Sequence, residues 1–349
     1  MSKLPTVSII IPTYNRKSVL IEALLSLNKV DYPNKLFEVI VINDGSSDGT
    51  EDAIKSIRKK INYNFKYFDG GRRGISHAKN IAIKKSVGEI IVSTDDDCLF
   101  EKTWLKKIIK PFVKSYIGAV GGPDKAIKNE NILAKSIDFT FSSFIGSGGI
   151  HGRFLKAKLG KCYPPGCNMA FRREIVKKIG FFDETLAPGE DTDYNHRIEK
   201  AGYKIDYVPT AFVWHRPRNS IKRFIPYIFK RGKARVEIIR RYPEYSELIY
   251  YLPALVVSVG VLLIFLSFFS AIFFKILIGF VLIYIFLVIT AGISAYQTYK
   301  NPVYFILVPP LIFLQHLFHG LGFIKGSIDL IPIILNKKKI KDHSSLRSQ

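Results

Sequence analysis

Short apolar runs alternate with amphipathic segments along the first third of the chain. The runs are rich in β-branched residues and indicate strands, whereas the segments between them repeat apolar residues at helical spacing. Strands are predicted at 7–11, 37–42, 64–68 and 89–93, and helices at 18–27, 51–61, 76–86 and 104–113. This alternation is typical of the α/β class, in which a mostly parallel sheet is flanked by helices on both faces.

The last hundred residues differ, because long stretches carry no charge. Residues 248–274, 276–299 and 301–324 are uncharged, and each exceeds the roughly 20 residues that a helix needs to cross a bilayer. We therefore predict an α-helical membrane region at 248–335, with helices at about 248–270, 276–296 and 303–324. The alternative is a buried core helix, but such helices rarely run this long without a polar face. The third stretch holds Pro309, Pro310 and His316, which also fits a re-entrant or interfacial segment.

The segment between these regions, 216–247, is strongly basic. From Arg216 to Arg241 there are ten basic residues and one acid, with apolar residues at helical spacing. This pattern predicts an amphipathic interfacial helix whose cations meet anionic lipid headgroups. Nucleic acid is the competing partner for a chain with a net charge of +23. The neighbouring apolar stretches favour lipid, and we expect no nucleic-acid binding.

Composition bounds the domain organisation and the location. With 48% hydrophobic residues the chain is too apolar to be disordered, and 349 residues fit roughly two domains. The apolar stretch at 7–11 is too short for a signal sequence, so we expect residues 1–250, with the catalytic domain 1–215, on the cytoplasmic side of a membrane that the chain crosses several times. Reduced Cys98, Cys162 and Cys167 fit that location. Three crossings would put the basic tail, 336–349, outside; either the third stretch does not cross or the tail breaks the positive-inside tendency.

Three polar clusters follow predicted strands, at 13–16, 43–50 and 95–97. Ligands of parallel sheets bind at the carboxyl ends of the strands, where these clusters would meet. Asp95, Asp96 and Asp97 are adjacent carboxylates, and a hard divalent cation, Mg²⁺ or Mn²⁺, is the usual relief of their repulsion. A solvated acidic turn is the alternative. Asp44 is placed to accept hydrogen bonds from a ligand, although its loop also caps the next helix.

Further candidates lie near residues 190 and 215. Glu190 and Asp191 begin a predicted helix, whose dipole stabilises carboxylates there; alternatively, one of them is a general base. His215 follows a strand-like stretch at 207–213. A lone histidine is more often structural than a ligand, but this one ends a strand in a carboxylate-rich protein. Motifs for a P-loop or a dinucleotide site are absent from the sequence.

Five motifs in chain order resemble those of the family 2 glycosyltransferases. They are Pro12-Thr-Tyr-Asn-Arg16, Asp44-Gly-Ser-Ser-Asp-Gly-Thr50, Asp95-Asp-Asp97, Gly166-Cys-Asn-Met-Ala-Phe-Arg172 and Gly189-Glu-Asp-Thr-Asp193. Each motif alone is weak, but together they span about 190 residues. The resemblance implies a GT-A nucleotide-diphospho-sugar transferase fold for residues 1–215, and membrane-attached relatives commonly add C-terminal helices.

The resemblance also implies roles for individual residues. Thr13, Tyr14 and Arg16 would line the base pocket, with Asp44 on the base and Asp95 beside the ribose. Arg73 and Lys79 would lie near the phosphates, and Asn168 near the donor sugar or the acceptor. Pro12 and Asp96 are expected to bind the donor as well. Lys79 stands where relatives more often have arginine. The metal would be held by Asp95 and Asp97, with His215 as a further ligand.

The implied reaction is an inverting, metal-dependent transfer of one sugar. Asp191 would deprotonate the acceptor hydroxyl, with Glu190 as the second choice. A lipid-linked glycan or a polyprenyl or dolichyl phosphate at the cytoplasmic face is the expected acceptor. Processive members carry a Gln-x-x-Arg-Trp motif that 224–232 lacks, so a polysaccharide synthase is the alternative and is disfavoured. A non-catalytic membrane scaffold with the same fold is the other alternative, and the intact acidic motifs oppose it.

Overall fold

The computed structural model describes residues 4–127, 129–148, 163–186 and 188–345, and it divides into two compact units. Unit 1 comprises residues 1–130 and 149–217, and unit 2 comprises 131–148 and 218–349. The short segment 131–148 thus belongs with the C-terminal helices, although the sequence places it inside the N-terminal region. Cys162 and residues 346–349 of the predicted tail lie outside the described residues.

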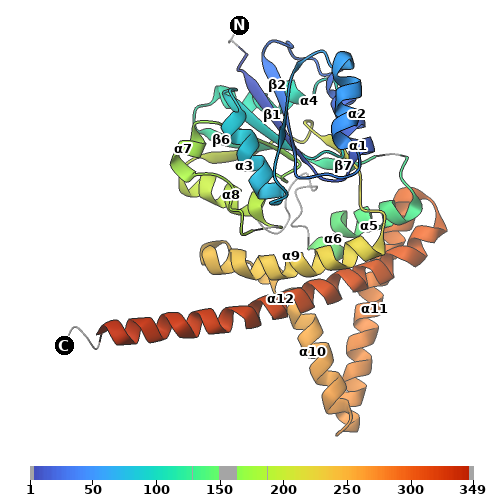
Figure 1. The fold of residues 1–349 in the computed structure, drawn as a ribbon. Coiled ribbons are helices and arrows are strands. Elements are labelled where there is room, and N and C mark those ends of the chain that lie inside the picture. Colours follow the sequence, from blue (N-terminus) through green and yellow to red (C-terminus); the bar gives the residue numbers. More distant parts are fainter. Residues whose placement is uncertain (1–3, 128, 149–162, 187, 346–349) are drawn as a thin grey trace. The chain divides into compact units, whose positions relative to one another are not determined.

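Unit 1 is built on a mostly parallel sheet, as the alternating pattern predicts (Figure 1). In spatial order its strands are β3 (Asn64–Asp69), β2 (Phe37–Asn43), β1 (Val7–Thr13), β4 (Ile90–Thr94), β8 (Asn168–Arg172), β6 (Ile117–Gly121) and β9 (Lys204–Tyr207). Strand β8 runs antiparallel to both of its neighbours, and the other pairs are parallel. The predicted α/β class is confirmed.

Helices cover both faces of this sheet because successive strand residues point to opposite sides. In β1, Ile9 and Ile11 join one core and Ile10 joins the other. The first core includes residues of α1 (Lys17–Leu27), α2 (Thr50–Ile57) and α4 (Trp104–Ile109). The second includes residues of α3 (Ile75–Lys85), α7 (Ile175–Ile179) and α8 (Glu190–Lys200). Both cores are apolar and buried, so the sheet is a rigid support for the loops at its edge.

A second, three-stranded sheet lies beside the end of β4. It consists of β5 (Cys98–Phe100), β10 (Val213–His215) and β7 (Asp124–Ala126). The pairing sets His215 opposite Cys98 and Val213 opposite Asp124. The stretch 207–213, predicted to be one strand, instead ends β9 and begins β10, with residues 208–212 in neither.

Unit 2 is helical. Its helices are α5 (Ile132–Ser142), α6 (Phe144–Ser147), α9 (Ile221–Arg241), α10 (Leu252–Ser267), α11 (Ala271–Tyr299) and α12 (Pro302–Ser345). Within the described residues, two stretches are long and apolar enough to cross a membrane, Ala271–Tyr299 and Pro302–Pro332, whereas α10 has only 16 residues. This supports membrane association by length and composition.

Candidate functional site

The acidic triplet lies at the carboxyl edge of the central sheet, because it follows directly on β4. Thr13, the last residue of β1, donates through Oγ1 to Asp96 Oδ2 at 2.7 Å. Arg16 donates to Asp96 Oδ1 at 3.1 Å and also hydrogen-bonds Asp97. Burial raises the pKa of Asp96 to about 6, although Arg16 opposes the shift. Two of the predicted clusters, at 13–16 and 95–97, therefore form one network.

His215 meets the same triplet from the small sheet. Its Nε2 lies 3.2 Å from Asp97 Oδ1, and its Nδ1 lies 3.8 Å from Asp124 Oδ2. Burial opposes the charge on His215, but Asp97 outweighs it and raises the pKa of His215 to about 10. Asp97 responds in the opposite sense: burial would raise its pKa, but His215 and Arg16 hold it below the usual value.

The donor atoms around Asp97 and His215 fit a metal ion. Ligand atoms of Asp97, Cys98 and His215 lie within 4.8 Å of one another. Asp97 Oδ1 and His215 Nδ1 are buried and, apart from the ion-pair contacts above, form no well-aligned hydrogen bond in the described part of the chain. A carboxylate oxygen is a ligand that hard divalent cations such as Mn²⁺ prefer, and an imidazole nitrogen is a common additional ligand of transition metals. Asp95 is a neighbour of this cluster rather than one of its grouped residues.

Asp44 organises the loop that follows β3. Its backbone N–H donates to Thr13 O at 2.8 Å, which ties β2 to β1 at their ends. Its carboxylate accepts from the backbone N–H groups of Arg73 and Gly74, both at 2.8 Å. Each oxygen retains a further lone pair, so Asp44 can still accept from a ligand. The guanidinium of Arg73 extends outward, with NH2 3.6 Å from Glu184 Oε2.

Tyr14 and Arg72 form an exposed stacking pair beside Asp44. The guanidinium of Arg72 lies 5.8 Å from the centre of the Tyr14 ring, and Tyr14 is 42% exposed. Gly45 allows this approach, because it has a φ of +77° and an added Cβ would lie 2.9 Å from Arg72 Cβ. An exposed ring with a cation over it is a suitable surface for stacking a nucleobase.

Lys79 lies between the acidic triplet and the Glu190–Asp191 pair. It is 1% exposed and donates through Nζ to Glu190 Oε1 at 2.9 Å. Burial would lower the pKa of Lys79, but attraction to Glu190, Asp95 and Asp191 raises it. Burial would raise the pKa of Glu190, but Lys79 lowers it. For Asp191, burial and the neighbouring Glu190 raise the pKa, although Lys79 opposes them.

Asp191 is oriented by backbone donors. Its Oδ2 accepts from Gly166 N at 2.9 Å, and its Oδ1 accepts from Thr192 N at 2.7 Å. A Cβ on Gly166 would lie 3.1 Å from Lys79 Nζ, so the glycine permits the close approach of the 166–172 motif to both side chains. Asp191 is therefore a fixed, partly accessible carboxylate that holds its proton more tightly than an ordinary aspartate.

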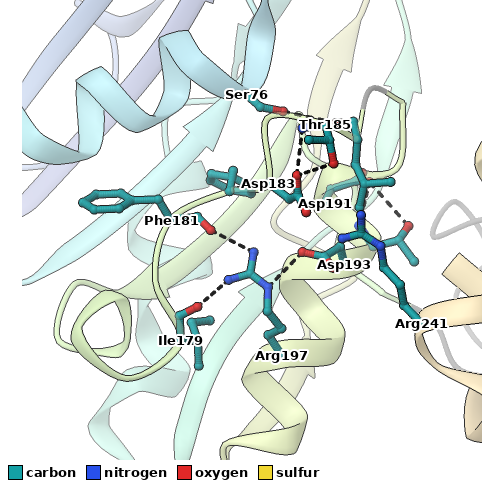
Figure 2. A network of polar contacts seen from close by, with 12 residues as sticks. Ser76, Ile179, Phe181, Asp183, Thr185, Asp191, Asp193, Arg197 and Arg241 are labelled. Carbon is teal, nitrogen blue, oxygen red and sulfur yellow. Dashed lines mark hydrogen bonds and ion pairs between the residues drawn. The ribbon is translucent and has the colours of Figure 1, made fainter. Parts of the chain in front are cut away.

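Arg197 anchors the helix that carries Glu190 and Asp191 (Figure 2). From the next turns of α8 it donates to Asp193 Oδ2 at 2.8 Å, to Ile179 O at 2.5 Å and to Phe181 O at 2.9 Å. The bond to Asp193 lies within α8, and the two bonds to carbonyl oxygens hold α8 against the end of α7 and the residues that follow it. The orientation of Glu190 and Asp191 thus depends on Arg197, which contacts neither of them in these three hydrogen bonds.

Asn168 and Pro12, two further predicted donor-binding residues, are also buried. Asn168 is fully buried; its Oδ1 accepts from Trp104 Nε1 at 2.9 Å, and its Nδ2 donates to Pro123 O and Ala211 O at 3.1 and 2.8 Å. Its side chain thus joins three segments below the sheet edge instead of extending to a ligand. Pro12 is a buried residue of β1, paired with Ile42, one position before the strand ends.

Sequence reasoning missed Asp124, the buried carboxylate that faces His215. It begins β7, just after β6 ends at Gly121, and therefore follows a strand end as the other acidic groups do. The signal was present in Gly121-Gly-Pro-Asp124, but the glycine-containing run at 117–121 was not assigned as a strand.

A family model described as "Glycosyl transferase family 2" matches residues 8–180. One similar curated protein is the Methanococcus voltae dolichyl N-acetyl-alpha-D-glucosaminyl phosphate 3-beta-D-2,3-diacetamido-2,3-dideoxy-beta-D-glucuronosyltransferase, with 27% identity over 92% of this chain and 97% of the relative. Another is the poly-beta-1,6-N-acetyl-D-glucosamine synthase of Staphylococcus epidermidis, with 28% identity over 60% of this chain and 49% of the relative.

One solved structure with a similar fold is a mannosyltransferase from Pyrobaculum calidifontis in complex with GDP-Man and Mn²⁺. The TM-score is 0.57 at 18% identity, and the match covers 94% of this chain and 88% of that one. At this identity the likeness shows the fold, and it agrees with the GT-A architecture that the motifs imply.

Proposed function

Because this chain belongs to the family 2 glycosyltransferases, we propose that it transfers one sugar from a nucleoside diphosphate to a membrane-associated acceptor, with inversion at the anomeric carbon. The observation that carries the proposal is the buried Lys79. It lies within the electrostatic reach of both Asp95 and the Glu190–Asp191 pair. Asp95, which is suited to the donor side, and Asp191, which is suited to the acceptor, therefore both lie near the ammonium group of Lys79.

The donor nucleotide is proposed to lie over the ends of β1 and β2. Tyr14 and Arg72 offer a stacking surface, and the carboxylate of Asp44 retains lone pairs for a base amide. Thr13 and Arg16 fix Asp96, which leaves Asp95 as the accessible carboxylate of the triplet for a ribose hydroxyl. Arg73, whose guanidinium is largely exposed, is available to the phosphates.

Asp97 and His215 would hold a divalent cation, with Asp95 nearby. Ligand atoms of Asp97, His215 and Cys98 lie within 4.8 Å of one another, and a carboxylate oxygen of Asp97 is the kind of ligand that both Mn²⁺ and Mg²⁺ prefer. When bound, such an ion neutralises charge on the diphosphate leaving group. The similar mannosyltransferase was solved with Mn²⁺, in agreement with this assignment.

Asp191 is the proposed general base. A carboxylate with a raised pKa accepts a proton from a hydroxyl more readily than an ordinary aspartate does. The ion pair with Lys79 keeps Glu190 ionised and fixed in position. Glu190 has a lowered pKa and therefore does not compete with Asp191 for the acceptor proton. Single displacement by a hydroxyl that Asp191 activates inverts the anomeric centre.

The acceptor is proposed to be a lipid-linked sugar. The Methanococcus voltae relative, which this chain matches along nearly its full length, is named for transfer to a dolichyl phosphate-linked N-acetylglucosamine. The apolar helices of unit 2 support membrane association, and a multi-pass location in the cell membrane is part of the proposal. The basic α9 supports contact with anionic headgroups on the cytoplasmic side. A polyprenyl or dolichyl phosphate itself is the alternative acceptor.

A processive polysaccharide synthase is the second candidate. The similarity to the Staphylococcus epidermidis synthase favours it, but the match covers only half of that protein. The absence of Gln-x-x-Arg-Trp from 216–247 opposes it. Product length separates the two proposals, because one predicts addition of a single residue and the other predicts a ladder.

Membranes that contain the chain would be incubated with a panel of nucleotide sugars, native lipid extract, and Mn²⁺, Mg²⁺ or a chelator. We expect one donor to release nucleoside diphosphate in a metal-dependent reaction and to label a lipid by one sugar. Asp97→Asn should abolish release, and Asp69→Asn, an exposed aspartate at the end of β3, should not. Release from no donor, together with no nucleotide binding, would refute the proposal.

A further inference from the structure

The hairpin formed by α10 and α11 exposes many large apolar side chains. The two helices are joined by a short turn at 268–270, and Figure 1 shows them leaving the α9–α12 pair together. Phe268 and Phe269 at the turn are 81% and 74% exposed, and Ile283 on α11 is 66% exposed. Lys275, just past the turn, is the one charged residue between 252 and 299. Surface of this kind fits lipid and not water.

The length of α10 limits how this hairpin meets a bilayer. At about 1.5 Å per residue its 16 residues extend about 24 Å, against about 30 Å of hydrocarbon. A helix of this length followed at once by a turn returns the chain to the side from which it came. The position of Lys275 next to the turn lets its long stem extend toward the far headgroups.

Helix α12 is paired with α9 along the same direction. An added Cβ on Gly322 would lie 2.1 Å from Phe229 O, one on Gly232 would lie 2.1 Å from His319 O, and one on Gly326 would lie 3.1 Å from Lys233 O. The two backbones therefore touch. The helices run in the same direction, because Phe224 and Ile228 cluster with Leu311, whereas Val236 clusters with Phe323. Lys233 Nζ is also 2.6 Å from Asp329 Oδ2, an ion pair between the two helices.

The charge of α9 keeps this pair out of the hydrocarbon. Its 21 residues include eight Lys or Arg and one Glu. Lysine and arginine are strongly disfavoured within the bilayer core, so such a helix lies at the interface. Because α12 runs beside α9 and shares an ion pair with it, α12 lies there as well. This holds although the composition of Pro302–Pro332 alone would permit a crossing, with a mean hydropathy of 1.5 against 2.9 for α11.

We propose that the α10–α11 hairpin is the only part of the described chain that enters the bilayer, and that α9 and α12 lie as a parallel pair on the headgroups of one leaflet. Unit 1 is joined to α9 directly at 217–218, so unit 1 and the tail share one side. This places Lys337, Lys338, Lys339 and Lys341 on the side of unit 1, where the positive-inside tendency puts basic residues. The inference rests on the proposed membrane attachment and not on the reaction.

Cysteine accessibility tests the sidedness without any activity readout. In a Cys162→Ser background, Ser56→Cys on exposed α2 reports unit 1, and Ser345→Cys at the end of α12 reports the tail. Inverted and right-side-out vesicles are treated with a membrane-impermeant maleimide. We expect both reporters to react in the same type of vesicle. If the tail reacts only from the face opposite to unit 1, α12 crosses the membrane. If the tail reacts only after detergent is added, it lies within the lipid. Either result overturns the proposal.

A second measurement tests insertion of the hairpin. Ile283→Arg places a cation on its exposed face, and Val113→Arg, at a 73% exposed apolar residue of unit 1, is the matched control. We expect alkaline extraction to release about twofold or more of the Ile283→Arg protein compared with the control, because arginine is disfavoured in hydrocarbon. Equal extraction of the two variants would show that the hairpin does not enter the bilayer. Failure of either test leaves the glycosyltransferase proposal intact, since donor hydrolysis is measured separately.

Discussion

Lys79 Nζ donates to Glu190 Oε1 at 2.9 Å, and Lys79 is 1% exposed. This one contact gives two adjacent carboxylates different properties. Glu190 is paired, and its pKa is lowered, whereas the pKa of Asp191 is raised. Neighbouring acids whose environments separate their pKa values are a recurrent basis for assigning catalytic roles. The relationship therefore supports Asp191 as the base and Glu190 as the group that fixes Lys79.

Replacing Lys79 tests this division. Lys79→Met leaves Glu190 buried without its cation, and breaking a buried pair typically costs about 3–5 kcal/mol. We expect a lower unfolding temperature and loss of activity, whereas Lys79→Arg should retain a large part of both. Lys84→Met, on the exposed face of the same helix, is the control. Thermal unfolding and donor hydrolysis are the two measurements. Full activity in Lys79→Met would contradict the proposed role of Lys79 in the site.

The pH dependence of the reaction should reveal Asp191. Its pKa is raised in the folded chain, and the base works only when ionised. Catalytic efficiency should thus fall on the acid side at a pH above the ordinary aspartate value of about 3.9. Asp191→Asn should lower kcat by about 10²–10⁴ and remove that acid limb. The limb belongs to the coupled Glu190–Asp191 pair, so Glu190→Gln should shift it.

The same variant separates the two proposed acceptors. A phosphate acceptor is already anionic at neutral pH and needs no base, so with such an acceptor Asp191→Asn would lose little transferase activity. A hydroxyl acceptor requires the base and predicts near-total loss. Comparing initial rates with a polyprenyl phosphate and with its sugar-phosphate derivative, at saturating donor, decides between them.

Metal binding should depend on both Asp97 and His215. Nucleoside diphosphate with Mn²⁺ should stabilise the wild-type chain, by about 2.7 kcal/mol at 100 times the Kd. Asp97→Asn and His215→Ala should each lose most of this metal-dependent stabilisation, and chelator should remove it from the wild type. Thermal unfolding with and without ligand is the measurement. Equal ligand shifts in wild type and Asp97→Asn would exclude Asp97 as a ligand.

Much of unit 1 could be predicted because β1, β2 and β4 are rich in β-branched residues and β3 is rich in aromatic ones, and these strands alternate with helical segments along the chain. The pattern located β1, β2, β3 and β4 within one or two residues at each end. It did not locate β6 or β8, whose sequences IGAVG and NMAFR have weak strand propensity and depend on long-range pairing. The antiparallel orientation of β8 also requires contacts between segments far apart in sequence.

The candidate site shows the same limit. Motifs identified Asp44, Asp97 and Asp191, because these follow strand ends or begin a helix. They did not reveal that Lys79 pairs with Glu190 across 111 positions, nor that Asn168 bonds Trp104 across 64. A motif identifies which residues matter; it does not separate a residue that contacts a ligand from one that holds the site together.

Asn168 provides a test of that distinction. All of its polar side-chain atoms bond protein groups, so Asn168→Ala removes the hydrogen bonds to the buried Trp104 Nε1 and to the carbonyl oxygens of Pro123 and Ala211. Pro123 O keeps the bond from Val213 N–H. An unsatisfied buried group costs about 1–3 kcal/mol, so we expect a fall of several degrees in the unfolding temperature. Asn168→Asp should also destabilise, because it would turn a carboxylate oxygen toward the carbonyls of Pro123 and Ala211.

The control is Asn34→Ala, at an exposed asparagine that donates to Asn62 O at 2.7 Å, and it should change stability little. At a temperature where the Asn168 variants stay folded, the KM for the donor should remain close to that of the wild type. A donor KM raised tenfold or more in a variant of unchanged stability would instead make Asn168 a ligand-contacting residue. A side chain with a purely structural role lowers stability, and it leaves the donor KM of the folded protein nearly unchanged.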